Sequence, residues 1–182
     1  MRKVIGIGET ILDILFKNNQ PTVAVPGGSV FNGLVSLGRA GANVTFISEV
    51  GGDHVGDIIL NFMKENGIST DNVKVYPDRK SPISLAFLNE KNDAEYSFYK
   101  DYPSLRLDVD MPEVTSEDIV MFGSFYAITP QLRDKVKELL ALEAQYHFLP
   151  ESITAAIPAE VTPENVTMVQ NFVLDGIRAG SG

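Results

Sequence analysis

The sequence predicts an α/β fold in which a parallel sheet is connected by crossover helices. Three short apolar runs have the length and composition of buried strands, at residues 4–7, 44–47 and 119–122. Three amphipathic stretches alternate with them, at residues 29–40, 55–66 and 130–142. This alternation favours parallel strands, because a chain that re-enters a sheet in the same direction needs a crossover connection.

Two of the predicted helices have clear start signals. The first follows the turn Gly27–Gly28, with Ser29 as the expected N-cap, and stops near Gly41. The last begins at Pro130 with Thr129 as its cap. The buried stripe of the first helix consists of apolar residues at helical spacing: Val30, Phe31, Leu34, Val35 and Leu37.

Two further pairs of strands interrupt the alternation and predict β-hairpins. Residues 11–16 and 22–25 flank a polar turn, and residues 84–88 and 95–100 flank another. In the last strand Tyr96 and Phe98 share one face, because side chains alternate along a strand. The alternative is that these segments are extra strands at the edge of the main sheet.

The composition excludes several classes of protein. At 182 residues the chain is one domain or slightly more, and its formal net charge of −9 argues against a nucleic acid or an anionic membrane as partner. It has no cysteine, which excludes disulfides and thiolate metal sites. No apolar run approaches the length of a membrane span, and the start lacks a signal-peptide core. We therefore expect a cytoplasmic protein.

A glycine turn beside a helix start is the main candidate for a binding site. Gly27 and Gly28 allow the backbone to approach a ligand, and Asn32 places an amide in the first helical turn. Asp13 adds a carboxylate at the end of an apolar segment, where burial without a partner is costly. These groups predict a site for a small polar molecule. An ordinary strand-to-helix loop, with Asp13 as a structural cap, is the alternative.

Four segments together identify a family resemblance: residues 4–13, 26–32, 43–57 and 118–124. Their order and spacing resemble those of the ribokinase/PfkB carbohydrate kinases over about residues 1–142. The residues within the segments are most similar to those of fructokinase-like members. The resemblance implies a three-layer α/β sandwich with a small antiparallel β-lid, formed by strands near 11–26 and 83–100, that covers a sugar. It also implies ATP-dependent phosphoryl transfer to a sugar hydroxyl with magnesium, and a homodimer formed through the lid strands.

The resemblance also assigns roles to individual residues. Asp13 matches a carboxylate that hydrogen-bonds sugar hydroxyls, and Gly27, Gly28 and Asn32 match a sugar-contacting turn and amide. A second loop matches at Gly51, Asp53 and Gly56, but Gly52 stands where the family has an aspartate, which puts a polar role of that loop in doubt. The turn at Gly123 and Ser124 matches a strand end near the substrate crevice.

The phosphoryl-transfer machinery of the resembled family has no counterpart in the sequence. Members are about twice as long, and their Gly-Ala-Gly-Asp motif is absent, so no catalytic and no ATP-binding residue is predicted. The only match to the family's magnesium-linked Asn-x-x-Glu element, from Asn92 to Glu95, falls in a predicted hairpin turn, so no metal site is predicted. Two readings remain: a sugar kinase that lacks its catalytic half, or a non-catalytic sugar-binding or assembly module, fragment or fusion.

Residues 143–182 form a tail that resembles nothing and carries a predicted helix at 163–179 with a linker-like end. A chain cut from the larger fold would expose an apolar face at Ile5, Ile119 and Met121. The lid strands would add Phe87, Tyr96 and Phe98, and these surfaces predict a dimer. The acidic residues Glu113, Glu117 and Asp118 are predicted to lie in a solvated loop.

Overall fold

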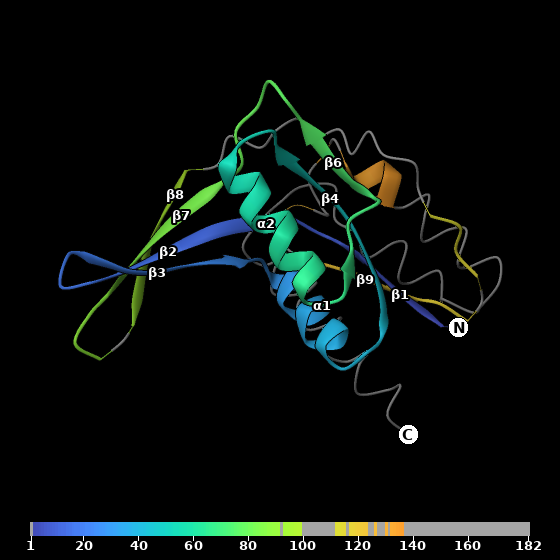
Figure 1. Ribbon diagram of the computed structural model, residues 1–182, viewed down its shortest axis with the longest axis horizontal. Coiled ribbons are helices and arrows are strands. Elements are labelled where there is room, and N and C mark those ends of the chain that lie inside the picture. The colour runs from blue at the N-terminus through green and yellow to red at the C-terminus, as the bar shows by residue number, and fades with distance from the viewer. Residues whose placement is uncertain are drawn as a thin grey trace.

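The computed structural model contains two sheets, a parallel one that carries the core and a second one that projects from it (Figure 1). It describes residues 2–91, 93–99, 112–115, 117–123, 126, 130 and 132–136. The predicted tail at 143–182, Thr129, Ser124, Asn92 and Lys100 lie outside the described residues. Among the helices that the structure describes, none is long and apolar enough to span a membrane.

The parallel sheet has the strand order β5-β4-β1-β9, with β6 also paired to β4. Its strands are β1 (Lys3–Ile7), β4 (Asn43–Gly51), β5 (Ile68–Ser69), β6 (Val73–Tyr76) and β9 (Ile119–Phe122). Every pairing in this sheet is parallel, as the alternation predicts. The three predicted strands are confirmed, whereas β5 and β6 were not expected and β4 continues beyond its apolar run.

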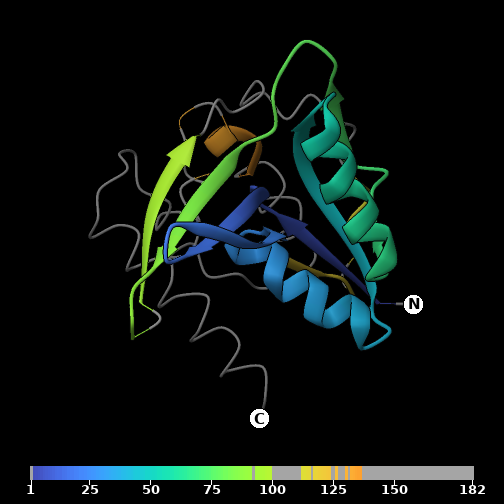
Figure 2. The same ribbon diagram turned by 60° about the vertical axis from the view of Figure 1, so that its left-hand side comes forward.

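Two helices cover one face of this sheet, α1 (Ser29–Arg39) and α2 (His54–Glu65) (Figures 1 and 2). Their apolar stripes and the inner strands form the core, in which Phe31, Leu34, Phe46, Ile59 and Met63 are fully buried. The prediction that Ser29 caps α1 is wrong: Gly28 occupies the N-cap position and no side chain caps the helix. Ser29 is the first helical residue. Of the helix expected at 130–142, residues 130 and 132–136 are described and helical.

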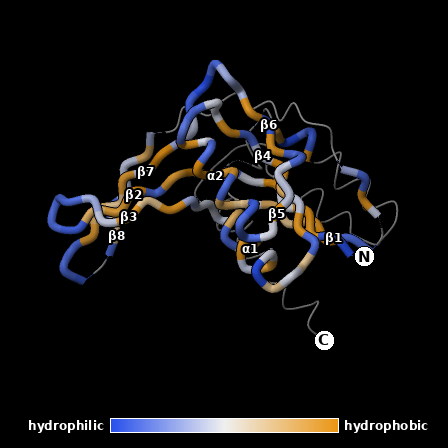
Figure 3. The backbone as a smooth tube through the Cα atoms, in the orientation of Figure 1, coloured by the Kyte–Doolittle hydropathy of each residue, from blue (hydrophilic) through white to orange (hydrophobic). Residues whose placement is uncertain are grey.

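The second sheet, here called the lid sheet, has the order β3-β2-β7-β8. It consists of β2 (Ile11–Lys17), β3 (Gln20–Gly27), β7 (Ile83–Leu88) and β8 (Ala94–Tyr99). Both predicted hairpins are confirmed as antiparallel pairs, and a parallel pairing of β2 with β7 joins them. The β2–β3 turn is only Asn18-Asn19, both with positive φ, as two-residue hairpins require. Their hydrophilic tips project farthest from the core (Figure 3).

The expected exposed face of the parallel sheet is only partly present. Ile5 is fully buried because β1 lies between β4 and β9. Met121 is half-buried and packs against the core cluster, whereas Ile119 on β9 is 44% exposed. The expectation is therefore wrong for Ile5 and holds for Ile119.

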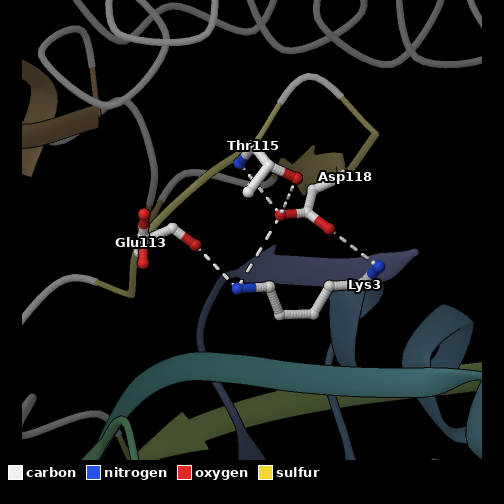
Figure 4. A network of polar contacts seen from close by, with 4 residues as sticks. All are labelled: Lys3, Glu113, Thr115 and Asp118. Atoms are coloured by element: carbon white, nitrogen blue, oxygen red, sulfur yellow. Dashed lines mark hydrogen bonds and ion pairs between the residues drawn. The ribbon is translucent and has the colours of Figure 1, made fainter. Parts of the chain in front are cut away.

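The prediction of a solvated acidic loop is wrong for Asp118 (Figure 4). This side chain is only 3% exposed and forms an ion pair with Lys3 Nζ at 3.7 Å. Its Oδ1 accepts a hydrogen bond from the Lys3 backbone N–H at 2.9 Å, and its Oδ2 accepts from the backbone N–H and hydroxyl of Thr115, both at 3.0 Å. Lys3 Nζ also donates to the Glu113 carbonyl at 2.6 Å. Asp118 thereby fixes the start of β9 to the start of β1.

These contacts also determine the ionisation of Asp118. Burial by itself raises its pKa, but the hydrogen bonds from Thr115 and Lys3 and the positive charge of Lys3 outweigh burial and hold the pKa below the ordinary value of 3.8. The ionised group therefore stabilises the fold above that pH. This contribution is lost as the pH falls through the lower pKa of the folded state.

We expect Asp118→Asn to lower the free energy of unfolding by about 1–3 kcal/mol, because an amide cannot accept from every donor that faces the carboxylate. The variant should also lose less stability than the parent chain as the pH falls below 4. Denaturant unfolding between pH 3 and pH 7 measures both. Glu117→Gln is the matched control, since its contact with Arg2 is solvent-exposed and should change stability by less than about 0.5 kcal/mol. Equal effects of the two substitutions would contradict this account.

Candidate functional site

A pocket lies where β1 ends, α1 begins and the lid sheet starts. Its lining includes three predicted site residues, Asp13 from β2, Gly28 from the turn before α1 and Asn32 from the first turns of α1. The sequence places Asp13 and Asn32 on different elements, and the structure brings them to one cavity. The remaining lining residues are Glu9, Ile11, Ser29, Tyr96 and Phe98. The pocket lies beyond the carboxyl end of β1, where ligands bind in open α/β sheets.

Asp13 is half-buried and is held from the neighbouring strand β7. Strand register places it directly opposite Ser84, whose hydroxyl donates a hydrogen bond to Asp13 Oδ1. On its other side Asp13 faces Val25 of β3. The carboxylate is thus partnered within the lid sheet and still lines the pocket.

The two glycines of the turn have different physical roles. Gly27 does not line the pocket; a Cβ there would collide with the Asp13 carboxylate, so this glycine leaves room for Asp13. Gly28 lines the pocket with φ of 140°, a conformation that side-chain-bearing residues rarely adopt, and a Cβ there would lie 2.5 Å from the Glu9 carbonyl oxygen. The Thr10 hydroxyl donates to the Gly27 carbonyl at 3.3 Å and ties this turn to the start of β2.

Asn32 presents an exposed side chain at the amino end of α1. Its backbone N–H donates to the Gly28 carbonyl at 2.9 Å. This hydrogen bond holds the backbone of Asn32 beside the turn, and the side-chain amide extends from there. No acidic residue occupies the first turn of α1. The partial positive charge of the helix start therefore faces the pocket without a carboxylate from that turn.

Two aromatic side chains of β8 line the pocket from the lid. Tyr96 and Phe98 stack with ring centroids 5.7 Å apart and an interplanar angle of 8°. They lie opposite Ala86 and Ser84, on the same face of the lid sheet as Asp13, as their alternation predicts. Both are more than half exposed, which leaves their rings accessible to a ligand.

Asp53 has a polar role that the substitution at Gly52 had put in doubt. It is the N-cap of α2: Oδ1 accepts from the Gly56 N–H and from the Ser81 hydroxyl, both at 2.9 Å. Its Oδ2 accepts from the Ser81 N–H at 3.0 Å. Burial raises its pKa, but these hydrogen bonds and the charge of Lys80 outweigh burial and lower the pKa below 3.8. The loop fixes the segment that leads into β7 and is not part of the pocket lining.

Sequence reasoning missed Glu9 and Ser84. Glu9 lies between two strands of different sheets, and although it falls within the matching segment 4–13, the sequence assigned it no role. Ser84 is the only polar residue of β7, and this isolated hydroxyl in an apolar strand was the available signal. Glu9 also acts on the buried Tyr126, whose pKa is raised by burial and then by the negative charges of Glu49 and Glu9, so its phenol stays protonated.

The other expected positions contribute less. Gly123 is buried at the end of β9, and a Cβ there would meet Val30 at an ordinary 3.5 Å. Glu95 lies in β8, away from the pocket lining. Within the described ranges, no three or more His, Cys, Asp and Glu side chains come together as they would to hold a metal ion.

Comparison with known proteins places most of the chain in one group. Residues 1–148 match the model of the pfkB family carbohydrate kinases. The chain is 25% identical over 138 residues to probable fructokinase-6, chloroplastic, of Arabidopsis thaliana, which covers 69% of this chain and 36% of that protein. It is 44% identical over 87 residues to the ribokinase of Bacillus subtilis (strain 168), which covers 48% and 28%. The chain spans less than half the length of these relatives.

Solved structures show the same fold. The fructokinase of Xylella fastidiosa with bound ATP superposes with a TM-score of 0.62 at 19% identity, covering 82% of this chain and 53% of that one. The fructokinase of Halothermothrix orenii gives a TM-score of 0.63 at 18% identity, covering 79% and 54%. The resemblance found in the sequence is thereby confirmed for the family and for the fold.

We expect Gly27→Ala to lower the free energy of unfolding by about 1–3 kcal/mol, because the added methyl group overpacks against the Asp13 carboxylate. In an Asp13→Ala background the same substitution should cost little, since the colliding group is gone. Denaturant unfolding of the four chains measures the coupling. Gly123→Ala, which creates only an ordinary contact, is the control. A cost at Gly27 that does not depend on residue 13 would contradict the steric explanation.

Proposed function

We propose that this chain is the sugar-binding part of a sugar kinase. It belongs to the pfkB family of carbohydrate kinases, because that family's model matches residues 1–148. The whole protein would transfer the terminal phosphoryl group of ATP to a hydroxyl of a fructose-like sugar. The chain itself would supply the part that binds and covers the sugar.

The observation that carries this proposal is the convergence of Asp13, Gly28 and Asn32 on one pocket. A carboxylate accepts hydrogen bonds from sugar hydroxyls, and an amide both donates and accepts them. The backbone at Gly28 allows close approach of the ligand, and the rings of Tyr96 and Phe98 offer an apolar surface to the carbon skeleton. The pocket therefore offers polar groups to the hydroxyls of a sugar and an apolar surface to its carbon skeleton.

The nucleotide and magnesium of the family are assigned to no residue of this chain. The sequence has no Gly-Ala-Gly-Asp motif, and the described residues contain no carboxylate cluster that fits a metal ion. These side chains therefore have no proposed part in phosphoryl transfer. Residues outside this chain would provide the catalytic base and the phosphate-binding amides. A cytoplasmic location stays a prediction.

We also propose a homodimer formed through the lid sheet. Its contact surface is only one face of that sheet and does not include all three aromatic residues expected from the sequence. Tyr96 and Phe98 line the pocket, whereas register places Phe87 on the opposite face of the lid sheet. There Phe87 stacks on Phe16, with ring centroids 4.9 Å apart, and both rings are only half-buried. Tyr99, on the same face, is 59% exposed. This outer face of the lid is the surface that a second copy would cover.

We expect the 182-residue chain to bind fructose or ribose, and Asp13→Ala to weaken that binding about tenfold or more, because a hydrogen bond to a charged group contributes about 1.5–3 kcal/mol. Isothermal calorimetry measures the affinity. Glu65→Ala removes an exposed carboxylate of α2, far along the chain from the pocket residues, and should leave binding unchanged.

Equal affinities of the parent chain and Asp13→Ala would remove Asp13 from the sugar site. Sugar-dependent release of ADP by this chain alone would contradict the assignment of the transfer machinery to residues outside it.

We also expect light scattering at micromolar concentration to give twice the mass of one chain. Phe87→Glu, on the outer face of the lid, should shift the population to monomers, because a charge would be desolvated in the contact. Val75→Glu, which changes an apolar residue of β6 that is 41% exposed outside the lid, is the matched control and should not. A monomeric parent chain would refute the dimer.

A further inference from the structure

We propose that Ser84 is a positioning residue that holds the Asp13 carboxylate in the orientation required by the sugar. This inference rests on the proposed function, since it concerns how that same pocket is organised. Ser84 itself is fully buried and does not line the pocket, so it acts only through Asp13.

The Asp13 carboxylate is constrained from two sides. On one side its Oδ1 accepts the hydrogen bond from the Ser84 hydroxyl. On the other side its Oδ2 lies against Gly27, at the place that any side chain at 27 would occupy. A donor on one side and a close backbone on the other leave the carboxylate little freedom to rotate. It therefore meets a ligand already oriented, which lowers the entropy lost on binding.

The Ser84 hydroxyl is shielded from solvent. Ser84 has no exposed surface, and its register partner on β8, on the same face of the lid sheet, is the aromatic Phe98. A buried hydroxyl is costly unless it is hydrogen-bonded, so an apolar residue here would serve packing better. The hydroxyl is explained by its acceptor, the Asp13 carboxylate, to which it provides a charge-assisted hydrogen bond.

The position of Ser84 is itself fixed by its strand. Parallel pairing aligns Ser84 with Asp13, and the Leu12 N–H donates to the Pro82 carbonyl at 3.1 Å just before this pair. Ser81, three residues before Ser84, is held by two hydrogen bonds to Asp53 and by a third from the Gly51 N–H at 2.9 Å. A shift of β7 along β2 would therefore break the hydrogen bonds of Ser81 with Asp53 and Gly51.

The test compares Ser84→Thr with Ser84→Val in the 182-residue chain. The two variants have nearly the same shape and differ in the hydroxyl. We expect Thr to retain fructose affinity within about twofold and Val to weaken it about tenfold, as loss of a hydrogen bond to a charged group predicts. Ser84→Ala removes the hydroxyl without adding bulk and should weaken fructose binding as Val does. The control is Ser97→Ala, which changes an exposed serine of β8 on the outer face of the lid sheet.

A double-mutant cycle separates positioning from simple packing. In an Asp13→Ala background, the chains with Val and with Thr at position 84 should bind fructose with equal affinity, because the carboxylate that Ser84 would orient is absent. Equal affinities of the Thr and Val variants in the parent background would overturn the proposal. A difference that persists without Asp13 would also overturn it, since Ser84 would then act independently of the carboxylate.

The ¹³C NMR signal of the Asp13 carboxyl carbon provides a readout that needs no sugar. We expect its chemical shift to match the parent chain in Ser84→Thr and to move in Ser84→Val. If the parent chain binds no sugar, the proposed function fails, and the NMR signal alone tests the Ser84–Asp13 interaction. Equal chemical shifts in the two variants would overturn this interaction, and different shifts would support it.

Discussion

Three residues, Gly8 to Thr10, carry the chain from the end of β1 in the parallel sheet to the start of β2 in the lid sheet, and the pocket depends on this passage. Gly8 donates from its N–H to the Ile47 carbonyl at 3.3 Å and accepts from the buried Ser48 hydroxyl at 2.8 Å. Thr10 then binds the Gly27 carbonyl. Because these groups are buried, both sheets and the turn before α1 are fixed around one short segment. The result is that Asp13, on β2, lies beside the start of α1.

Sequence patterns predicted those helices and strands whose regular spacing of apolar residues can be recognised within a short stretch of the sequence. The strands at 4–7 and 119–122, the helices α1 and α2 and both hairpins are of this kind. The pattern underestimated β4, because its second half buries the polar residues Ser48 and Glu49, which read as the end of a strand. It missed β5 and β6 because two and four residues are too short to show a period.

Errors at polar residues had a common physical cause. Asp118 read as solvated because its partner Lys3 is 115 residues away in the sequence. The polar role of Asp53, which Gly52 had put in doubt, depends on Ser81, 28 residues away. The sequence could single out Gly28 and Asn32 because a glycine turn and a helix start are local patterns, and Asp13 because it is an acid in an apolar segment. Ser84 was not, because only strand register brings it to Asp13. Local sequence reveals the groups available for a site, and pairing between distant strands decides which of them meet.

The parallel pairing of β2 with β7 has a consequence for the order in which the molecule assembles. Asp13 and Ser84 are 71 positions apart in the sequence, and α1, α2 and three strands of the parallel sheet lie between them. Closing so long a loop is entropically unfavourable until the intervening segments have become compact. The hairpins can form early by themselves, but their junction waits for the α/β core. The carboxylate and its buried hydroxyl therefore meet late, and a chain with an incompletely formed core has no pocket.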